Sequence, residues 1–149
     1  MSYKNLLAPN FLCMFFLACW MSQTPAGFGE EVENRVIIRL HFQVHIVNGF
    51  ADNAKPLVIH CRSKDDDLGE HTLWKGQEFR FEFGISWVKS THFSCNFKWG
   101  LKKLDNISVF KHGIETWSCK ATGLCFWKAA ADGIYFSNNN QNWEKRFDW

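Results

Sequence analysis

The stretch that decides the fold class is Val36-Ile-Ile-Arg-Leu-His-Phe-Gln-Val-His-Ile46. Every even-numbered position in it is apolar. The polar residues between these positions are Arg39, His41, Gln43 and His45. A period of two residues over this length predicts a half-buried antiparallel strand, which the following glycine and Asp-Asn pair would end.

The same alternation returns along the rest of the chain. It is clear over residues 57–63, 77–83 and 91–99, and no segment shows a sustained helical period. Shorter strand candidates are residues 71–74, 107–110, 116–120, 124–128 and 134–137. We expect Ala121-Thr122-Gly123 to join two of these strands as a hairpin. Eight or so short strands separated by turns predict an all-β sandwich or barrel.

Aromatic side chains on the apolar strand faces are expected to fill the space between two sheets. They are Phe79, Phe81, Phe83, Phe93, Phe97, Trp99, Trp117 and Trp127. Each such ring buries on the order of 150–250 Å². Trp143 and Trp149 lie outside the clear strands and are better candidates for an exposed aromatic surface.

The N-terminus has the parts of a secretion signal. Lys4 precedes an apolar run of 11 residues, Phe11-Leu-Cys-Met-Phe-Phe-Leu-Ala-Cys-Trp-Met21, too short to span a bilayer. Thr24-Pro25-Ala26 offers small residues for a cut after Ala26. We expect residues 1–26 to be a signal peptide and residues 27–149 to form one domain, with its core at about residues 36–137. A short buried helix or an uncleaved anchor is the alternative.

Charge and hydropathy exclude several classes of partner. The signal carries one lysine and no acid, so the mature chain has 16 basic and 15 acidic residues, a net charge of +1. Such a balance gives no electrostatic footprint for nucleic acid. No later segment approaches 18 continuous apolar residues, so we expect a mature chain that is not embedded in a membrane.

Four cysteines lie outside the signal: Cys61, Cys95, Cys119 and Cys125. In an exported chain they predict two disulfides. Cys61 and Cys95 share the inward face of two strands, and the other two face each other across the expected hairpin. We therefore expect Cys61–Cys95 and Cys119–Cys125, with crossed pairing open, in a small disulfide-stapled antiparallel β-sandwich. Their spacing fits no usual zinc site, and we expect no metal or cofactor.

The segment Val58-Ile-His-Cys-Arg-Ser-Lys-Asp-Asp-Asp-Leu-Gly69 resembles the most distinctive motif of the plant self-incompatibility S1 family, also called S-protein homologues. The resemblance covers about residues 44–136, and the four cysteines occupy matching places. Further matching pieces are Val44-His-Ile-Val-Asn48, Phe81-Glu-Phe83, Thr91-His-Phe-Ser-Cys-Asn-Phe-Lys-Trp99, Ser108-Val-Phe110, Cys125-Phe-Trp127 and Asp132-Gly-Ile-Tyr135. Lys128-Ala-Ala-Ala131 is less charged than the corresponding stretch usual in the family, and the tail after Phe136 has no matching motif.

This resemblance implies a secreted, extracellular β-sandwich that works by binding. The best understood members are stigma proteins that act as ligands for a pollen membrane receptor. We therefore expect an extracellular signalling ligand whose partner is a membrane receptor on another cell. The alternative is a wall or defence protein that binds glycans or microbial surfaces. The oligomeric state stays open.

The charged run over residues 64–69 is expected to be a loop, and Asp65, Asp66, Asp67 and Leu68 are the candidate receptor contacts. Calcium binding and a plain solvated turn are the other interpretations, but the ligand spacing of a calcium loop is missing. Asn106-Ile107-Ser108 is a glycosylation sequon, so Asn106 is a candidate glycan site.

No catalytic site is expected. The chain has no Gly-x-Ser-x-Gly elbow, and none of its histidines lies in the His-Gly-Leu-Trp-Pro context of secreted ribonucleases. His41 and His45 would lie about 13 Å apart on a strand, too far to share a metal. The other histidines are expected to be single surface residues: His60, His71, His92 and His112.

Overall fold

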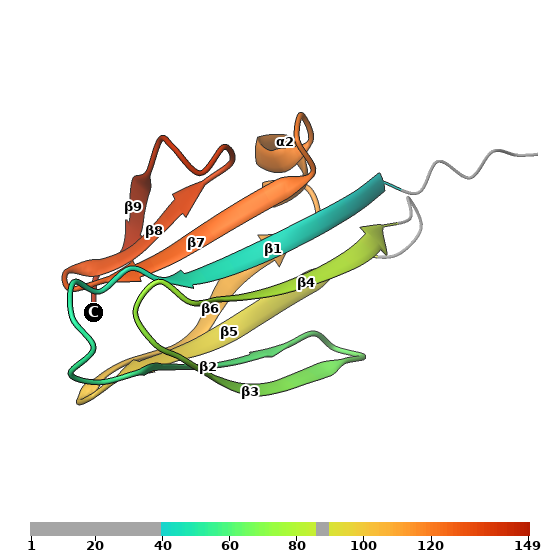
Figure 1. Cartoon of the computed structure of the whole chain (residues 1–149). Helices are drawn as coiled ribbons and strands as arrows, with labels where there is room; N and C mark the ends of the chain where they lie inside the picture. The colour runs from blue at the N-terminus through green and yellow to red at the C-terminus, as the bar shows by residue number, and fades with distance from the viewer. Residues whose placement is uncertain (1–39, 86–89) are drawn as a thin grey trace, which may run out of the picture. The chain divides into compact units, whose positions relative to one another are not determined.

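The computed structural model describes residues 40–85 and 90–149, which form nine strands and one short helix (Figure 1). The elements are β1 (Leu40–Asn48), β2 (Leu57–Arg62), β3 (Asp67–Leu73), β4 (Glu78–Ile85), β5 (His92–Trp99), β6 (Lys102–Lys111), α2 (Glu115–Cys119), β7 (Leu124–Ala130), β8 (Gly133–Ser137) and β9 (Glu144–Phe147). The expected signal peptide and the first residues of the opening alternation lie outside the described residues.

The strands form two sheets that face each other, so the expected all-β sandwich is confirmed (Figure 1). One sheet has the order β4-β1-β7-β8-β9 and the other the order β3-β2-β5-β6. The pairings are antiparallel with one exception among the described strands, because β1 and β7 run parallel, from Gln43 opposite Leu124 to Asn48 opposite Ala129. The expected antiparallel sandwich is thus confirmed, with one parallel pair that the sequence analysis did not anticipate.

The alternating apolar residues point between the sheets. Phe42, Val44 and Ile46 of β1 are almost fully buried, and they meet residues of the facing sheet such as Phe110, whose ring centroid lies 5.1 Å from that of Phe42. Trp127 is buried and donates its indole N–H to the carbonyl of Val109 at 2.8 Å. The core is therefore built by the alternation that the sequence shows.

Asn48, the last residue of β1, joins that strand to the turn that connects β3 of one sheet to β4 of the other. Its side chain is buried, donates Nδ2–H to the carbonyl of Leu73 at 2.8 Å and accepts the backbone N–H of Phe50 at 3.0 Å. Its backbone N–H donates to the Gln77 carbonyl, and its carbonyl accepts the Gly76 N–H, both at 2.9 Å. One residue thus links the end of β1 to the turn between β3 and β4.

The predicted hairpin over residues 116–128 is wrong. Residues Glu115–Cys119 form the helix α2, and a turn leads from it into β7. The Glu115 carboxylate accepts the backbone N–H of Lys111 at 2.6 Å, while the Ile114 carbonyl accepts N–H groups from the helix. Trp117, expected in the core, is 66% exposed on this helix.

Two disulfides staple the sandwich, with the pairing that the sequence favoured. Cys61 and Cys95 are direct partners on β2 and β5, with Cα atoms 4.0 Å apart. Cys119 and Cys125 join the end of α2 to the start of β7, with Cα atoms 5.6 Å apart. The second bridge replaces the cross-hairpin geometry that we expected with a link from helix to strand.

The C-terminal strand β9, which the sequence did not predict, is held by an ionic cluster. Asp132 accepts the Tyr135 hydroxyl at 2.6 Å and the Lys145 ammonium at 3.0 Å, and Lys145 also pairs with Asp148 at 2.8 Å. The Tyr135 hydroxyl, and after it Lys145, lower the pKa of Asp132, while the Asp132 carboxylate raises the pKa of Tyr135. These contacts fasten the tail to the β7–β8 turn.

Candidate functional site

The turn between β2 and β3 is shorter and more ordered than the loop expected over residues 64–69. The Ser63 N–H donates to the Asp66 carbonyl at 2.8 Å and closes the turn. The Ser63 hydroxyl oxygen accepts the backbone N–H groups of Asp65 at 3.2 Å and Asp66 at 2.9 Å. Such side-chain bonds to the following backbone define a Ser/Thr turn. Sequence reasoning missed Ser63, although a serine two and three residues before aspartates was its signal.

Asp67 belongs to β3 and has a structural role. Its carboxylate accepts the Gly69 N–H at 2.9 Å and lies 2.6 Å from Nε2 of His60 on the neighbouring strand. The Gly69 N–H, and after it the His60 ring, hold the pKa of Asp67 below its ordinary value. Gly69 has a φ of 79°, a left-handed conformation that suits glycine. Asp67 therefore fixes the strand that follows the turn.

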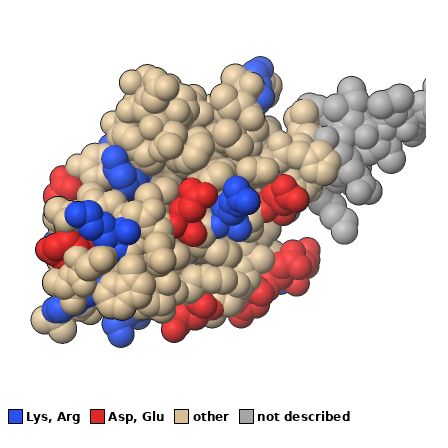
Figure 2. Space-filling view, in the orientation of Figure 1, with Lys and Arg blue, Asp and Glu red and all other residues tan. Residues whose placement is uncertain are grey.

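The residues at the tip of the turn present their charges to solvent. Lys64 and Asp65 are exposed, and neither side chain has a hydrogen bond or ion pair among the described residues. Asp66 is exposed as well, and its carboxylate lies 3.5 Å from the Ser63 hydroxyl. Leu68 is half-buried and packs against the core. Acidic side chains gather at this end of β2 and β3 in Figure 2.

Among residues 40–85 and 90–149, no group of three or more His, Cys, Asp or Glu side chains is placed to hold a metal ion. Three histidines expected on the surface have contacts of their own. His71 stacks on Phe79 with ring centroids 3.7 Å apart, His60 bonds Asp67, and Nε2 of His92 lies 3.1 Å from the Ser108 hydroxyl.

His45 differs from its expected place on a polar surface. It lies on the outer face of its sheet, yet only 8% of it is exposed, because its ring stacks on Phe126 with centroids 4.6 Å apart. Its Nδ1 lies 3.4 Å from the Glu78 carboxylate. Its Nε2 has no hydrogen-bond partner among the described residues.

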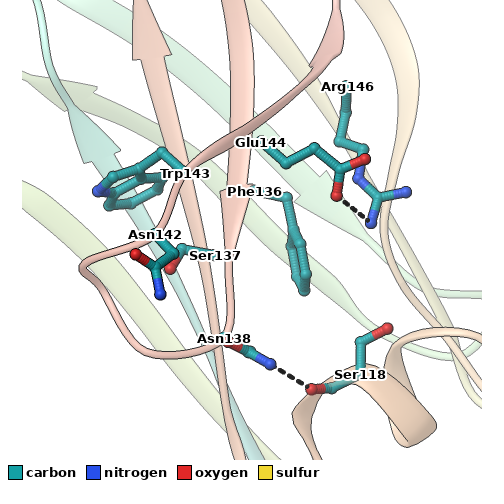
Figure 3. Close-up of a pocket in the computed structure, with 8 residues that line it drawn as sticks. All are labelled: Ser118, Phe136, Ser137, Asn138, Asn142, Trp143, Glu144 and Arg146. Atoms are coloured by element: carbon teal, nitrogen blue, oxygen red, sulfur yellow. Dashed lines mark hydrogen bonds and ion pairs between the residues drawn. The ribbon is translucent and has the colours of Figure 1, made fainter.

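A shallow pocket of about 340 Å³ lies between the β8–β9 connection and α2 (Figure 3). Its lining is polar and aromatic: Ser118, Phe136, Ser137, Asn138, Asn142, Trp143, Glu144 and Arg146. Sugar sites use free aromatic faces, but the Lys128 ammonium lies 4.0 Å above the Trp143 ring, and the Arg146 guanidinium lies 5.1 Å from the buried Phe136 ring. The two rings also lie on different sides of the ribbon in Figure 3.

The other aromatic candidate is also engaged. Trp149 is half-buried, donates its indole N–H to the Ala130 carbonyl at 2.6 Å and lies beside Phe50, with ring centroids 6.1 Å apart. Neither tryptophan outside the clear strands therefore offers a plain exposed ring.

Asn106, the candidate glycan site, lies within β6 and not in a turn. It is exposed, has a φ of 55° and stands where the pairing of β5 and β6 shifts register. Its side-chain oxygen accepts a hydrogen bond from Arg62 at 3.1 Å. The nitrogen that would carry a glycan is thus next to a fixed oxygen on an exposed strand.

In the part of the chain that the structure describes, no helix has the length and apolar character needed to cross a bilayer. The described residues thus define a disulfide-bonded β-sandwich with an ordered, charged turn at one end. A family model, plant self-incompatibility protein S1, matches residues 43–149. The chain belongs to this family, as its sequence motifs indicated.

Individual relatives agree with this assignment. S-protein homolog 24 of Arabidopsis thaliana is 39% identical over 84 residues, which cover 56% of this chain and 54% of the relative, about half its length. Self-incompatibility protein S1 of Papaver rhoeas is 28% identical over 141 residues, covering 90% of this chain and 88% of that protein. Both names are those of S-proteins, and neither is that of an enzyme.

One solved structure is also similar. It comes from work described as "Structure of SPH (Self-Incompatibility Protein Homologue) proteins, a widespread family of small, highly stable, secreted proteins from plants". It is 18% identical to this chain, with a TM-score of 0.49, and the match covers 74% of this chain and 91% of that one.

Proposed function

We propose that the protein is a secreted ligand that binds a membrane receptor on another plant cell, and that it contacts the receptor with the turn at Lys64, Asp65 and Asp66. Membership of the S1 family supports the general role. One observation supports the surface: the backbone of the turn is fixed by Ser63, while Lys64 and Asp65 have no side-chain partner among the described residues.

A fixed turn suits recognition for a physical reason. Binding costs free energy wherever a loop must be ordered, and a turn already ordered by its own hydrogen bonds avoids most of that cost. Exposed carboxylates on such a turn favour a cationic surface on the partner and speed the encounter at low salt. The action of the ligand is then binding without a chemical step.

Asp65→Ala is the most direct test, because the Asp65 side chain supports no other part of the protein. We expect it to weaken saturable binding of the labelled protein to plant plasma-membrane vesicles by about fivefold or more. A loss of this size is typical of an interface residue that contributes to affinity without being a dominant hot spot. Glu70→Ala is the matched control, since Glu70 is an exposed acid of β3 outside the turn. Asp67→Ala is less informative, because Asp67 caps Gly69.

The outcomes separate the candidate roles. Vesicle binding that protease treatment of the vesicles abolishes supports a protein receptor. Normal binding by Asp65→Ala and Asp66→Ala would show that the turn is not the contact surface. Binding to cell-wall polysaccharide alone would contradict the ligand role and favour the wall or defence function.

The export part of the proposal has its own test. Protein recovered from the medium of plant cells expressing the full chain should begin at Gly27, as shown by N-terminal sequencing. It should carry a glycan that Asn106→Gln removes, seen as a loss of mass. Retention of the intact chain inside the cells would contradict secretion.

A further inference from the structure

The strand β4 forms one edge of the five-stranded sheet, because it pairs with β1 on one side only. Figure 1 shows this strand at the border of its sheet. An unpaired edge offers a row of backbone N–H and C=O groups to any strand that approaches. Proteins commonly blunt such edges with lysine, proline or a bulge, and none of these occurs within β4.

The outer face of β4 carries the exposed residues Glu78, Arg80 and Glu82, and side chains of both charges lie over this strand in Figure 2. Glu78 faces His45, and Glu82 accepts a hydrogen bond from Gln43 at 3.2 Å. Arg80 has no hydrogen bond, ion pair or ring contact among the described residues. It is therefore a cation at the sheet edge that lacks a partner within the described part of its own chain.

The inner face of the same strand is aromatic. Phe79, Phe81 and Phe83 are only half-buried, although each packs against the core. The three rings follow one another along the edge, with centroids 5.7 Å apart for the first pair and 6.0 Å apart for the second. A hollow of about 350 Å³ lies at the middle of the strand, lined by Gln43, Arg80, Phe81 and Glu82.

We propose that a second copy of this chain binds at β4, and that the two β4 strands pair antiparallel about a two-fold axis at Phe81. Both five-stranded sheets then continue into one sheet. Such a contact is isologous, since the same surface is used twice. It is also a form of strand addition, in which the backbone supplies affinity and the side chains set the register.

The order of residues in β4 selects this register. Residues that face each other directly in an antiparallel pair point to the same side of the sheet. A two-fold axis between the two β4 strands must therefore lie between two copies of the same residue, and we name the axis by that residue. With the axis at Phe81, Arg80 of each copy faces Glu82 of the other, and Phe79 faces Phe83. Opposite charges and aromatic pairs in facing positions both stabilise a sheet.

The neighbouring registers are unfavourable. With the axis at Arg80, the two arginines face each other and Glu78 faces Glu82. With the axis at Glu82, the two glutamates face each other and Arg80 faces a glycine. Like charges in facing positions destabilise strand pairing. An axis at Phe79 also sets Arg80 opposite Glu78, but it places Phe81 opposite Gln77 and loses the facing aromatic pair, so the charges and the rings together favour the axis at Phe81.

The test is the association state of the protein purified from plant cells expressing the full chain, measured by sedimentation over a range of concentrations. We expect a reversible dimer. Arg80→Glu places two like-charged pairs at the interface by symmetry and should raise the dissociation constant about tenfold or more. Glu82→Arg should do the same. Lys98→Glu makes an equal change of charge on the exposed face of β5 and should leave the dimer intact.

Mixing the two variants gives the sharper result. Each alone faces like charges, but a mixed pair sets two glutamates of one chain against two arginines of the other, so the mixture should dimerise. The swapped double variant Arg80→Glu, Glu82→Arg should also dimerise as the unaltered protein does. A monomer at every concentration, or a mixture no better associated than its components, would overturn the proposal. Neither measurement depends on receptor binding.

Discussion

Replacement of Asn48 should destabilise the protein more than its polar character suggests. Its side chain is 1% exposed and makes two buried hydrogen bonds, one to the Leu73 carbonyl and one from the Phe50 N–H. Asn48→Ala leaves both backbone groups buried without a partner. Each such group costs about 1–3 kcal/mol, so the free energy of unfolding should fall by about 2–6 kcal/mol.

A second substitution at the same position tests the contribution of the Asn48 Nδ2–H donor by itself. Asn48→Asp keeps an oxygen for the Phe50 N–H but turns the other side-chain atom into an oxygen facing the Leu73 carbonyl. Burial next to a carbonyl raises the pKa of the new carboxyl in the folded protein. The carboxyl, once protonated, can donate to that carbonyl. Stability is therefore present at low pH and is lost as the pH rises through the folded-state pKa.

The assay is denaturant unfolding followed by tryptophan fluorescence at about pH 4 and pH 7.5, with the disulfides intact. Asn142→Ala is the control, since that exposed side chain makes no hydrogen bond among the described residues, and it should change stability by less than about 0.5 kcal/mol. The reasoning is refuted if Asn48→Ala stays within that limit, or if Asn48→Asp loses as much stability at low pH as at neutral pH.

Two further predictions concern the C-terminal strand. A Cβ atom at Gly133 would overlap the Phe147 carbonyl, so Gly133→Ala should lower the free energy of unfolding by about 1–3 kcal/mol and speed hydrogen exchange in β9. An unchanged exchange rate in that strand would contradict it. The pKa of Asp132 is lowered in the folded protein by its hydroxyl and ammonium partners, so its contribution is present above the ordinary carboxyl pKa and is lost as the pH falls through the lowered one. Asp132→Asn should therefore flatten the loss of stability in acid, and a profile that keeps its shape would refute that role.

The strands that alternate most clearly were predictable from sequence. In β5 the odd-numbered residues Phe93, Cys95 and Phe97 are buried and their neighbours are more exposed, because one face of the strand meets the core, and β1 follows the same alternation except at His45. The same parity placed Cys61 and Cys95 on one face, and the structure makes them direct partners. The alternation of apolar and polar residues was enough to predict a strand wherever one face of that strand packs on the core and the other faces solvent.

The sequence-based predictions are wrong where contacts between residues distant in sequence determine the secondary structure. Residues 115–119 contain β-branched and aromatic side chains that favour a strand, but the bond from Glu115 to Lys111 and the bridge to Cys125 close a helical turn instead. Parallel pairing of β1 with β7 leaves no mark in either segment. The tail lacks alternation, and β9 is held by contacts with distant residues: its pairing with β8, the packing of Phe147 on Trp127 and the ion pair of Lys145 with Asp132.

The candidate site was predictable in place but not in detail. The cluster of aspartates indicated an exposed charged segment, and the exposed turn tip lies there. The sequence did not distinguish Asp65, which has no side-chain partner among the described residues, from Asp67, which caps a backbone amide. That difference depends on the hydroxyl of Ser63 and on the His60 side chain of the adjacent strand.

The parallel pairing of β1 and β7 also determines the order in which the two sheets can form during synthesis. The four-stranded sheet is drawn from β2, β3, β5 and β6, with only β4 of the other sheet between them in sequence, and Cys61–Cys95 closes inside it. β1 is made first and can pair with β4 on one side, but its other side must wait for β7. Synthesis from Asn48 to Leu124 takes on the order of 4–15 s at about 5–20 residues per second. Once Lys111 is made, the four-stranded sheet can be complete while its apolar inner face is covered only by β1 and β4. The segment from β7 to β9 therefore ends the period of greatest exposure to aggregation.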